Sequence, residues 1–145
     1  MSLVNLDLPM APSVNSLYAT VNGRRVLSRE GRIYHKTVAA LVKAQCSRAV
    51  QAAFPWETPV ALSLYVTFPD RRRCDVSNRI KALEDALKLA GVYKDDSQVT
   101  ELHAYKKYER GVSRIYVMID PLAKDAKAGE KTPLIGSPMI SEEGE

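Results

Sequence analysis

Hydrophobic residues alternate with polar ones at the start of the chain, where residues 4–8 predict a short strand. Prolines then interrupt the pattern, and we expect an irregular loop over 9–15 because proline fits neither a helix interior nor a central strand. Two further runs, 17–21 and 24–27, flank the dipeptide Asn22-Gly23, which is typical of a tight hairpin since both residues tolerate a positive φ. The N-terminal part therefore predicts one strand followed by a hairpin.

Helical spacing replaces this alternation in two longer segments. Hydrophobic residues three and four positions apart predict a helix that begins after the N-cap Ser28 and ends near Ala53. The same spacing predicts a second helix over 75–90, with Gly91 in the left-handed position that follows its end. Between the helices, segment 60–68 is uncharged and rich in residues that favour strands, so we expect it at the centre of a sheet.

The last periodic segments, 98–108 and 111–120, predict two strands that are joined at residues 109–111 as a second hairpin. The resulting order β-ββ-α-β-α-ββ predicts an α+β fold, a single domain over residues 1–121 with a mixed β-sheet and two helices. From 122 to 145 the chain is rich in Gly, Pro, Ala, Lys and Glu, and we expect a flexible C-terminal tail.

Charge and composition narrow the function classes. The formal net charge is +4, and because the last 24 residues carry three lysines and five acidic residues, the first 121 carry +6. A basic body indicates a polyanionic partner such as a nucleic acid. No hydrophobic run reaches the roughly 20 residues of a membrane span, and Cys46 and Cys74 stand in no zinc motif. We therefore expect a cytoplasmic protein with two free thiols and no membrane association.

Segment 69–98 gathers the residues that point to chemistry. It opens with three consecutive arginines, continues as a helix behind Asp75, and ends with the adjacent Asp95 and Asp96. Mg²⁺ prefers oxygen ligands and usually takes one or two carboxylates together with water and phosphate, and a bound metal acidifies a water for attack on a phosphodiester. Arginines would hold neighbouring phosphates, and a lysine would offset charge in the transition state. These residue types are the ones that phosphodiester hydrolysis needs.

Ser77, Lys81 and Asp85 share one face of the second helix because they lie four residues apart. Each candidate also has a purely structural interpretation. Asp75 is a good N-cap, Lys81 with Asp85 is a common pair on a solvated helix face, and the two aspartates after the helix are ordinary turn residues. The arginines would likewise fit a solvated turn, so residue types alone leave both interpretations open.

Three motifs carry a resemblance to a known family. The first is LPMAPSVNSLY at 8–18, which resembles a Pro-Pro-Ser-x-Asn-x-x-Tyr opening. The second is RRRCDVSNRIKALEDAL at 71–87, which resembles an arginine-rich turn followed by Asp-x-Asp-Asn and, three residues on, by Lys. The third is DDSQV at 95–99, which resembles Asp-Asp-x-Gln. In this order and spacing they resemble the RusA-like Holliday junction resolvases, over about residues 3–121.

The resemblance implies a homodimer that cuts branched DNA, namely four-way junctions, with Mg²⁺, for which Mn²⁺ can substitute. By position it implies that the catalytic residues are Asp75, Lys81 and Asp96. Metal ligands, for one ion or two, would come from four aspartates: Asp75, Asp96, Asp85 and Asp95. We expect DNA contacts from six residues: Arg71, Arg72, Arg73, Asn15, Arg24 and Arg25.

Ser77 is a departure from the family pattern, which has a second aspartate at this position. Either Asp85 or Asp95 supplies the missing charge, or Ser77 positions a water, or activity is weakened. Asn78 matches the motif and is a possible supporting residue, as is Ser77.

Two rival functions stay open at this point. One is a junction-binding protein with weak or no catalysis, in which Ser77 is the damaging change, and the other is a basic single-domain protein that binds RNA. Convergence of the Asp75, Asp85 and Asp96 carboxylates to metal-bridging distance would favour the enzyme.

Overall fold

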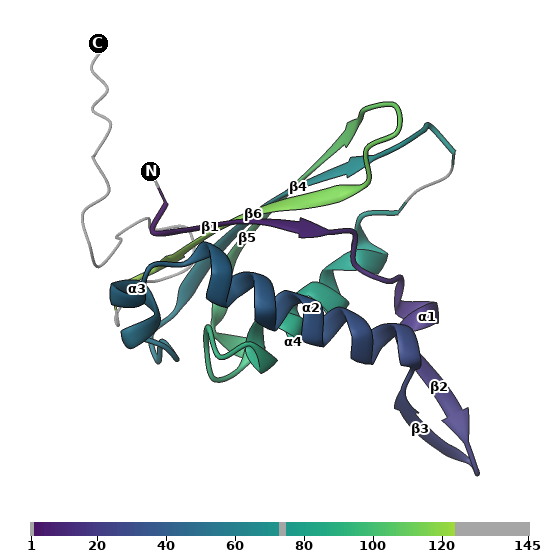
Figure 1. Cartoon of the computed structure of the whole chain (residues 1–145), viewed down its shortest axis with the longest axis horizontal. Coiled ribbons are helices and arrows are strands. Elements are labelled where there is room, and N and C mark those ends of the chain that lie inside the picture. Colours follow the sequence, from purple (N-terminus) through teal and green to yellow (C-terminus); the bar gives the residue numbers. More distant parts are fainter. Residues whose placement is uncertain (1, 73–74, 124–145) are drawn as a thin grey trace.

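The computed structural model describes residues 2–72 and 75–123, which form a four-stranded sheet with helices packed on one face (Figure 1). The strand order is β1-β6-β4-β5. These strands span Val4–Pro9 (β1), Val60–Phe68 (β4), Val99–Tyr108 (β5) and Arg114–Pro121 (β6). β6 runs antiparallel to β1 and to β4, whereas β5 runs parallel to β4. The sheet is therefore mixed, and the predicted α+β class is confirmed.

Strands β5 and β6 do not form the hairpin that the sequence predicted. β4 lies between them and pairs with β5 on one side and with β6 on the other. The turn after β5 instead passes over the end of β4, where the Glu109 N–H donates to the Phe68 carbonyl at 3.0 Å. β4 is uncharged and mostly buried, so pairing on both sides satisfies backbone groups that water would not reach.

Helices α2 (Arg29–Gln45) and α4 (Ser77–Leu89) supply the helical side of the core. Large side chains with at most 1% exposure come from strands and helices alike: Leu6, Leu8, Leu62, Leu64, Leu83, Leu87, Ile115 and Ile119. Gly91 has a φ of 88° after the end of α4, as expected. The helix begins at Ser77, two residues later than predicted, and a carboxylate oxygen of Asp75 accepts a hydrogen bond from the Ser77 N–H.

The helix predicted from Ser28 to Ala53 is two helices. Its start is confirmed, because the Ser28 hydroxyl accepts from the Gly31 N–H at 3.0 Å. α2 ends at Gln45, and α3 (Arg48–Ala52) begins after Ser47, whose hydroxyl accepts from the Val50 N–H. Serine competes well as an N-cap, so Ser47 begins a new helix where hydrophobic spacing alone predicted continuation.

The predicted hairpin at Asn22-Gly23 is confirmed as β2 (Tyr18–Val21) paired with β3 (Arg24–Leu27), and both turn residues have positive φ. This two-stranded sheet projects from the body of the protein beyond the start of α2 (Figure 1). The predicted loop before it contains a short helix, α1 (Val14–Leu17), which begins after the N-cap Ser13.

At the C-terminal side, Leu122 is buried and its N–H donates to the Pro59 carbonyl at 2.7 Å. The fold thus includes at least one residue of the predicted tail, and the tail from residue 124 lies outside the described residues. Arg73 and Cys74 lie outside them too. Within the described part, no helix is long and apolar enough to cross a membrane.

Candidate active site

Lys81 is the point at which three of the predicted site residues meet. Its Nζ lies 3.0 Å from Asp96 Oδ2 and 3.2 Å from Asp85 Oδ1. Helix α4 presents Lys81 and Asp85 one turn apart, and the turn before β5 brings Asp96 back to the same helix. Since both carboxylate oxygens lie within 3.2 Å of one nitrogen, they are no more than twice that distance apart. We call Lys81, Asp85 and Asp96 the Lys81 cluster.

The electrostatics of the Lys81 cluster keep the lysine charged. Hydrogen bonds to Asp96 and then to Asp85 raise the pKa of the Lys81 ammonium above its ordinary value. Half of the Lys81 side chain is exposed, against 19% for Asp85 and 27% for Asp96. A phosphate arriving from solvent would therefore meet a permanent cation that is backed by two partly covered carboxylates.

Asp75 contacts the start of α4 and not the Lys81 cluster. Its Oδ1 accepts a hydrogen bond from the Ser77 N–H at 3.0 Å, and the N-cap position of α4 is Val76, so Asp75 lies one residue before the cap that the structural interpretation assigned to it. Among residues 2–72 and 75–123, no three His, Cys, Asp or Glu side chains lie close enough together to hold a metal ion. We expected the carboxylates of Asp75, Asp85 and Asp96 to converge. Asp85 and Asp96 meet at Lys81, whereas the contact found for Asp75 is with Ser77.

Asp95 is engaged elsewhere. Its carboxylate accepts from the Ser97 N–H at 3.0 Å and lies 3.5 Å from Lys88 Nζ, and with Gln98 it forms a capping box on the 3-10 helix η1 (Asp96–Gln98). The hydrogen bonds from Ser97, and then the one from Lys88, lower the pKa of Asp95. Of the two residues considered as substitutes for the carboxylate missing at Ser77, Asp85 is the one that contacts Lys81.

Two residues beside the Lys81 cluster were missed by the sequence interpretation. Glu84 is half-buried, and burial, followed by the charge of Asp96, raises the pKa of its carboxyl. The Tyr18 hydroxyl donates to Asp85 Oδ2 at 3.4 Å from a position 67 residues earlier. Tyr18 ends the first of the three motifs, so a signal for it existed, whereas nothing in the spacing distinguished Glu84 from a solvated helix residue.

The arginine turn, residues 71–73, is described at Arg71 and Arg72, and both side chains contact other protein groups. Arg72 donates through Nε and Nη2 to Asp70 Oδ2, and the Arg71 guanidinium lies 4.6 Å from the centre of the Tyr108 ring. Beside it a pocket of about 370 Å³ is lined by Arg72 and by Arg79, which the sequence did not single out. The buried Arg79 Nε has no hydrogen-bond partner among the described residues.

Of the other predicted residues, Asn15 and Arg25 line a pocket of about 320 Å³ beside the β2–β3 hairpin. Arg24 is exposed on the same hairpin, and Asn78 is half-buried in the first turn of α4.

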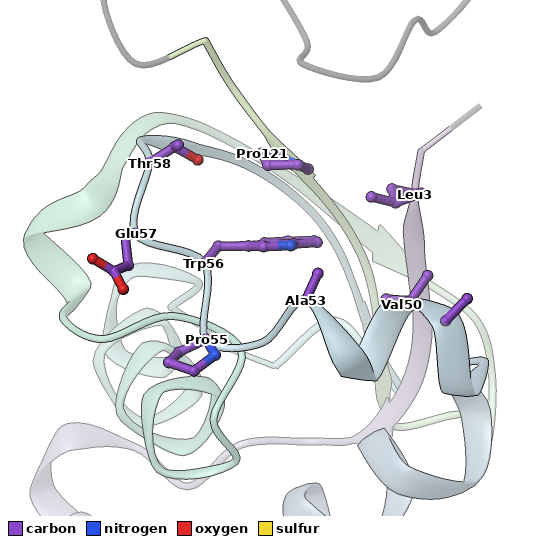
Figure 2. Close-up of a pocket in the computed structure, with 9 residues that line it drawn as sticks. Leu3, Val50, Ala53, Pro55, Trp56, Glu57, Thr58 and Pro121 are labelled. Carbon is purple, nitrogen blue, oxygen red and sulfur yellow. The ribbon is translucent and has the colours of Figure 1, made fainter.

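Figure 2 shows an apolar pocket of about 620 Å³ in a different part of the protein, beside α3 and the start of β1. Its described lining includes Leu3, Trp56 and Pro121, and its charged lining residue is the acidic Glu57. α2 separates α3 from the hairpin, and its 17 residues correspond to a length of about 25 Å. A pocket with an acidic residue and no basic residue in its described lining does not suit a phosphate, so we assign it no part in DNA binding.

Sequence comparisons agree on one family. A family model described as Endodeoxyribonuclease RusA matches residues 7–120. The crossover junction endodeoxyribonuclease RusA of Enterobacteria phage 82 is 36% identical over 106 residues, which are 73% of this chain and 84% of that protein. The protein of that name from Escherichia coli K12 has the same identity and coverage, and the one from Shigella sonnei is 35% identical. The matched region contains every candidate residue named above.

Proposed function

The chain belongs to the RusA family of endodeoxyribonucleases, and on this premise we propose that it resolves Holliday junctions by paired cuts during DNA recombination and repair. The relatives are named for crossover junctions, and they match over most of their length. The observation that carries the proposal is the Lys81 cluster, since it joins a cation and two carboxylates at an exposed surface of a basic protein.

We propose that Lys81 acts on the scissile phosphate. Its ammonium stays charged and half exposed, so a phosphodiester could approach it from solvent. A fixed cation at that place offsets the negative charge that develops on the phosphoryl oxygens during attack. Asp96 and Asp85 hold the ammonium from two elements of the fold, which fixes its position before DNA arrives.

The proposed cofactor is Mg²⁺, with Mn²⁺ as a substitute. Asp85 and Asp96 each place a carboxylate oxygen beside the Lys81 ammonium. Mg²⁺ commonly uses one or two carboxylates with water and substrate phosphate. Two carboxylates fit the ion, and we propose Asp75, which is exposed at the start of α4 and contacts Ser77 in this structure, as a further ligand. When bound, the metal would acidify a water for attack and would stabilise charge on phosphate oxygens.

We propose Asp75, Lys81 and Asp96 as the catalytic residues, and Asp85 as the substitute for the carboxylate that is absent at Ser77. The contact between Asp85 and Lys81 supports this choice over Asp95, which caps η1. Asn78 and Ser77 would support the site from the first turn of α4.

The proposed partner is junction DNA held by a homodimer. A four-way junction has near two-fold symmetry, and two matched cuts require two sites, which a C2 dimer supplies. Among the described residues, the edge strands β1 and β5 each have one side without a neighbouring strand, and these sides offer surfaces for self-association. We propose that the dimer works in the cytoplasm and that the arginine turn and the hairpin arginines hold DNA phosphates.

A junction-binding protein with little catalysis is the second candidate. The neutral Ser77 and the position of Asp75 outside the Lys81 cluster favour it. Incubation of a labelled four-way junction and a linear duplex of the same sequence with wild-type protein and Mg²⁺ separates the two functions. Selective conversion of the junction to nicked duplexes supports the endonuclease, whereas tight binding without cutting under Mg²⁺ or Mn²⁺ supports the binding protein. A monomer mass by light scattering at micromolar concentration would contradict the dimer.

A further inference from the structure

The β2–β3 hairpin is a positively charged arm next to the Lys81 cluster. Residues 22–36 contain five basic residues and one acidic residue. In the part of the chain that the structure describes, Arg24 and Arg25 form no ion pair with an acidic side chain. The hairpin extends away from the body (Figure 1), so its charge faces solvent. A phosphate that binds there would not have to displace a protein carboxylate.

The base of the hairpin is held firmly against α2. The Ser28 N–H donates to the Leu17 carbonyl at 2.9 Å, and the Ser28 hydroxyl donates to the Ser16 carbonyl at 2.6 Å. Gly31 allows this approach, because a Cβ at that position would meet the Leu17 carbonyl oxygen at 2.9 Å. The hairpin is therefore placed at a fixed position relative to α2, which packs on α4.

Tyr18 touches both the hairpin and the Lys81 cluster. The Arg25 guanidinium lies over its ring, 4.3 Å from the ring centre. The Tyr18 hydroxyl donates to Asp85 Oδ2 at 3.4 Å, and the other oxygen of Asp85 faces Lys81. One side chain thus connects a cation of the arm with a carboxylate of the proposed catalytic site.

A pocket of about 320 Å³ opens at this point, and we call it the hairpin pocket. Its described lining residues are Val14, Asn15, Tyr18, Ala19, Thr20 and Arg25. The amide of Asn15, the hydroxyl of Thr20 and the guanidinium of Arg25 are donors of the kind that contact phosphate oxygens in protein–DNA complexes. No carboxylate stands among these described lining residues, so their charge is that of Arg25.

We propose that the hairpin pocket binds a backbone phosphate of the DNA, and that Tyr18 is a positioning residue that fixes Asp85 relative to this phosphate. The inference rests on the proposed junction cleavage and adds a subsite to it. Phosphates of one strand follow each other at about 3.4 Å along the axis, so a phosphate on Arg25 would lie within a few nucleotides of the cut. DNA bound in the pocket is thereby placed in register with the Lys81 cluster.

Binding without metal tests the pocket. We measure the anisotropy of a labelled four-way junction in EDTA between 50 and 200 mM salt, where cleavage does not interfere. Arg25→Ala should weaken binding about 5-fold and lower the slope of log K against log salt by about 1, because one phosphate contact is lost. Arg48→Ala removes the same charge in α3, at the other end of α2, and should leave the slope unchanged. Equal slopes for wild type and Arg25→Ala would overturn the proposal that the hairpin pocket binds a phosphate.

Two substitutions test the two contacts of Tyr18. Tyr18→Phe keeps the ring under Arg25, so binding and salt slope should not change, whereas kcat at saturating junction should fall about 3- to 10-fold through loss of one hydrogen bond. Tyr116→Phe is the matched control, because the Tyr116 hydroxyl contacts Asn5 Oδ1 at 3.3 Å on the sheet, and its kcat should equal that of wild type. An unchanged kcat for Tyr18→Phe would refute the positioning role.

Tyr18→Leu removes the aromatic ring and should reproduce the salt slope of Arg25→Ala, while a wild-type slope would show that Tyr18 does not hold Arg25. Thermal unfolding of each variant verifies that it is folded. If wild-type protein cuts no junction, the proposed function is wrong. The salt slopes measured without metal still decide whether the hairpin pocket binds a phosphate.

Discussion

Lys81 Nζ lies 3.0 Å from Asp96 Oδ2, a residue 15 positions later in the chain, on the far side of the turn between α4 and β5. The contact ties the helix that carries Lys81 to the turn that carries Asp96. Asp85 holds the same ammonium from one helical turn further along α4. The geometry of the proposed site therefore depends on two elements, and substitutions at either element should affect cleavage more than folding.

Removal of the ammonium group should lower kcat at Lys81 but not at Lys88, although both lysines lie on α4. We expect Lys81→Ala to lower kcat about 100-fold, since a fixed cation at the phosphate is lost, and to leave the melting temperature within about 3 °C, since exposed ion pairs contribute little to stability. Lys88→Ala is the control, because Lys88 pairs with Asp95 from the same helix. Similar kcat values for the two variants would remove Lys81 from the mechanism.

Binding and cutting should separate at Asp75. We expect Asp75→Asn to bind the junction in EDTA at least as tightly as wild type, because a carboxylate that repels phosphates is neutralised, and to cut at least about 100-fold more slowly with Mg²⁺. Asp95→Asn serves as a control, since Asp95 caps η1. A folded Asp75→Asn protein that no longer binds DNA would contradict the proposed division of roles.

Ser77→Asp restores the carboxylate of the family pattern. Because Asp85 already places a carboxylate beside Lys81, an added negative charge should crowd the site. Like charges disfavour each other's ionised forms, so cleavage at saturating Mg²⁺ should stay equal to that of wild type or fall. A clear rise in kcat would show instead that this chain had lost a ligand without compensation.

Glu84→Gln should stabilise the fold at neutral pH. Burial and the neighbouring Asp96 raise the pKa of Glu84 above its usual 4.5, so the folded state holds the proton more tightly than the unfolded state does. The stabilising contribution of protonated Glu84 is fully present below pH 4.5 and is lost as pH rises through the raised pKa. We expect Glu84→Gln to melt higher than wild type at pH 7 and at the same temperature as wild type below pH 4.5. A constant difference between pH 4 and pH 8 would refute this.

The helices and strands could be predicted from the sequence better than the pairing of the strands in the sheet. Hydrophobic period identifies β4 and α4, and local signals identify Ser28 as a cap and Asn22-Gly23 as a turn. Period does not say which strand pairs with which, because pairing depends on contacts far apart in sequence. The strands β5 and β6 are adjacent in the chain, yet each pairs with β4.

In the candidate site, too, local patterns indicated some residues but not the contacts that depend on packing. Helical spacing placed Lys81 and Asp85 on one face, and the motif order led to Asp96. Asp95 also forms a local capping box with Gln98, a contact that the motif did not indicate. The contact of Tyr18 with Asp85 spans 67 residues and depends on how α1 and the hairpin pack, so the first motif marks Tyr18 but does not indicate its partner.

Cleavage of branched DNA by the Lys81 cluster with a divalent metal can be tested by removing Asp96 and the metal separately. Wild-type protein and Asp96→Asn are incubated with a labelled four-way junction at concentrations where both bind it fully, with Mg²⁺ or with EDTA. This role of the Lys81 cluster predicts paired cuts by wild type with Mg²⁺, none with EDTA, and a rate at least about 100-fold lower for Asp96→Asn, because both the partner of Lys81 and a metal ligand are lost. Cleavage by Asp96→Asn at the wild-type rate, or cleavage by wild type in EDTA, would contradict it.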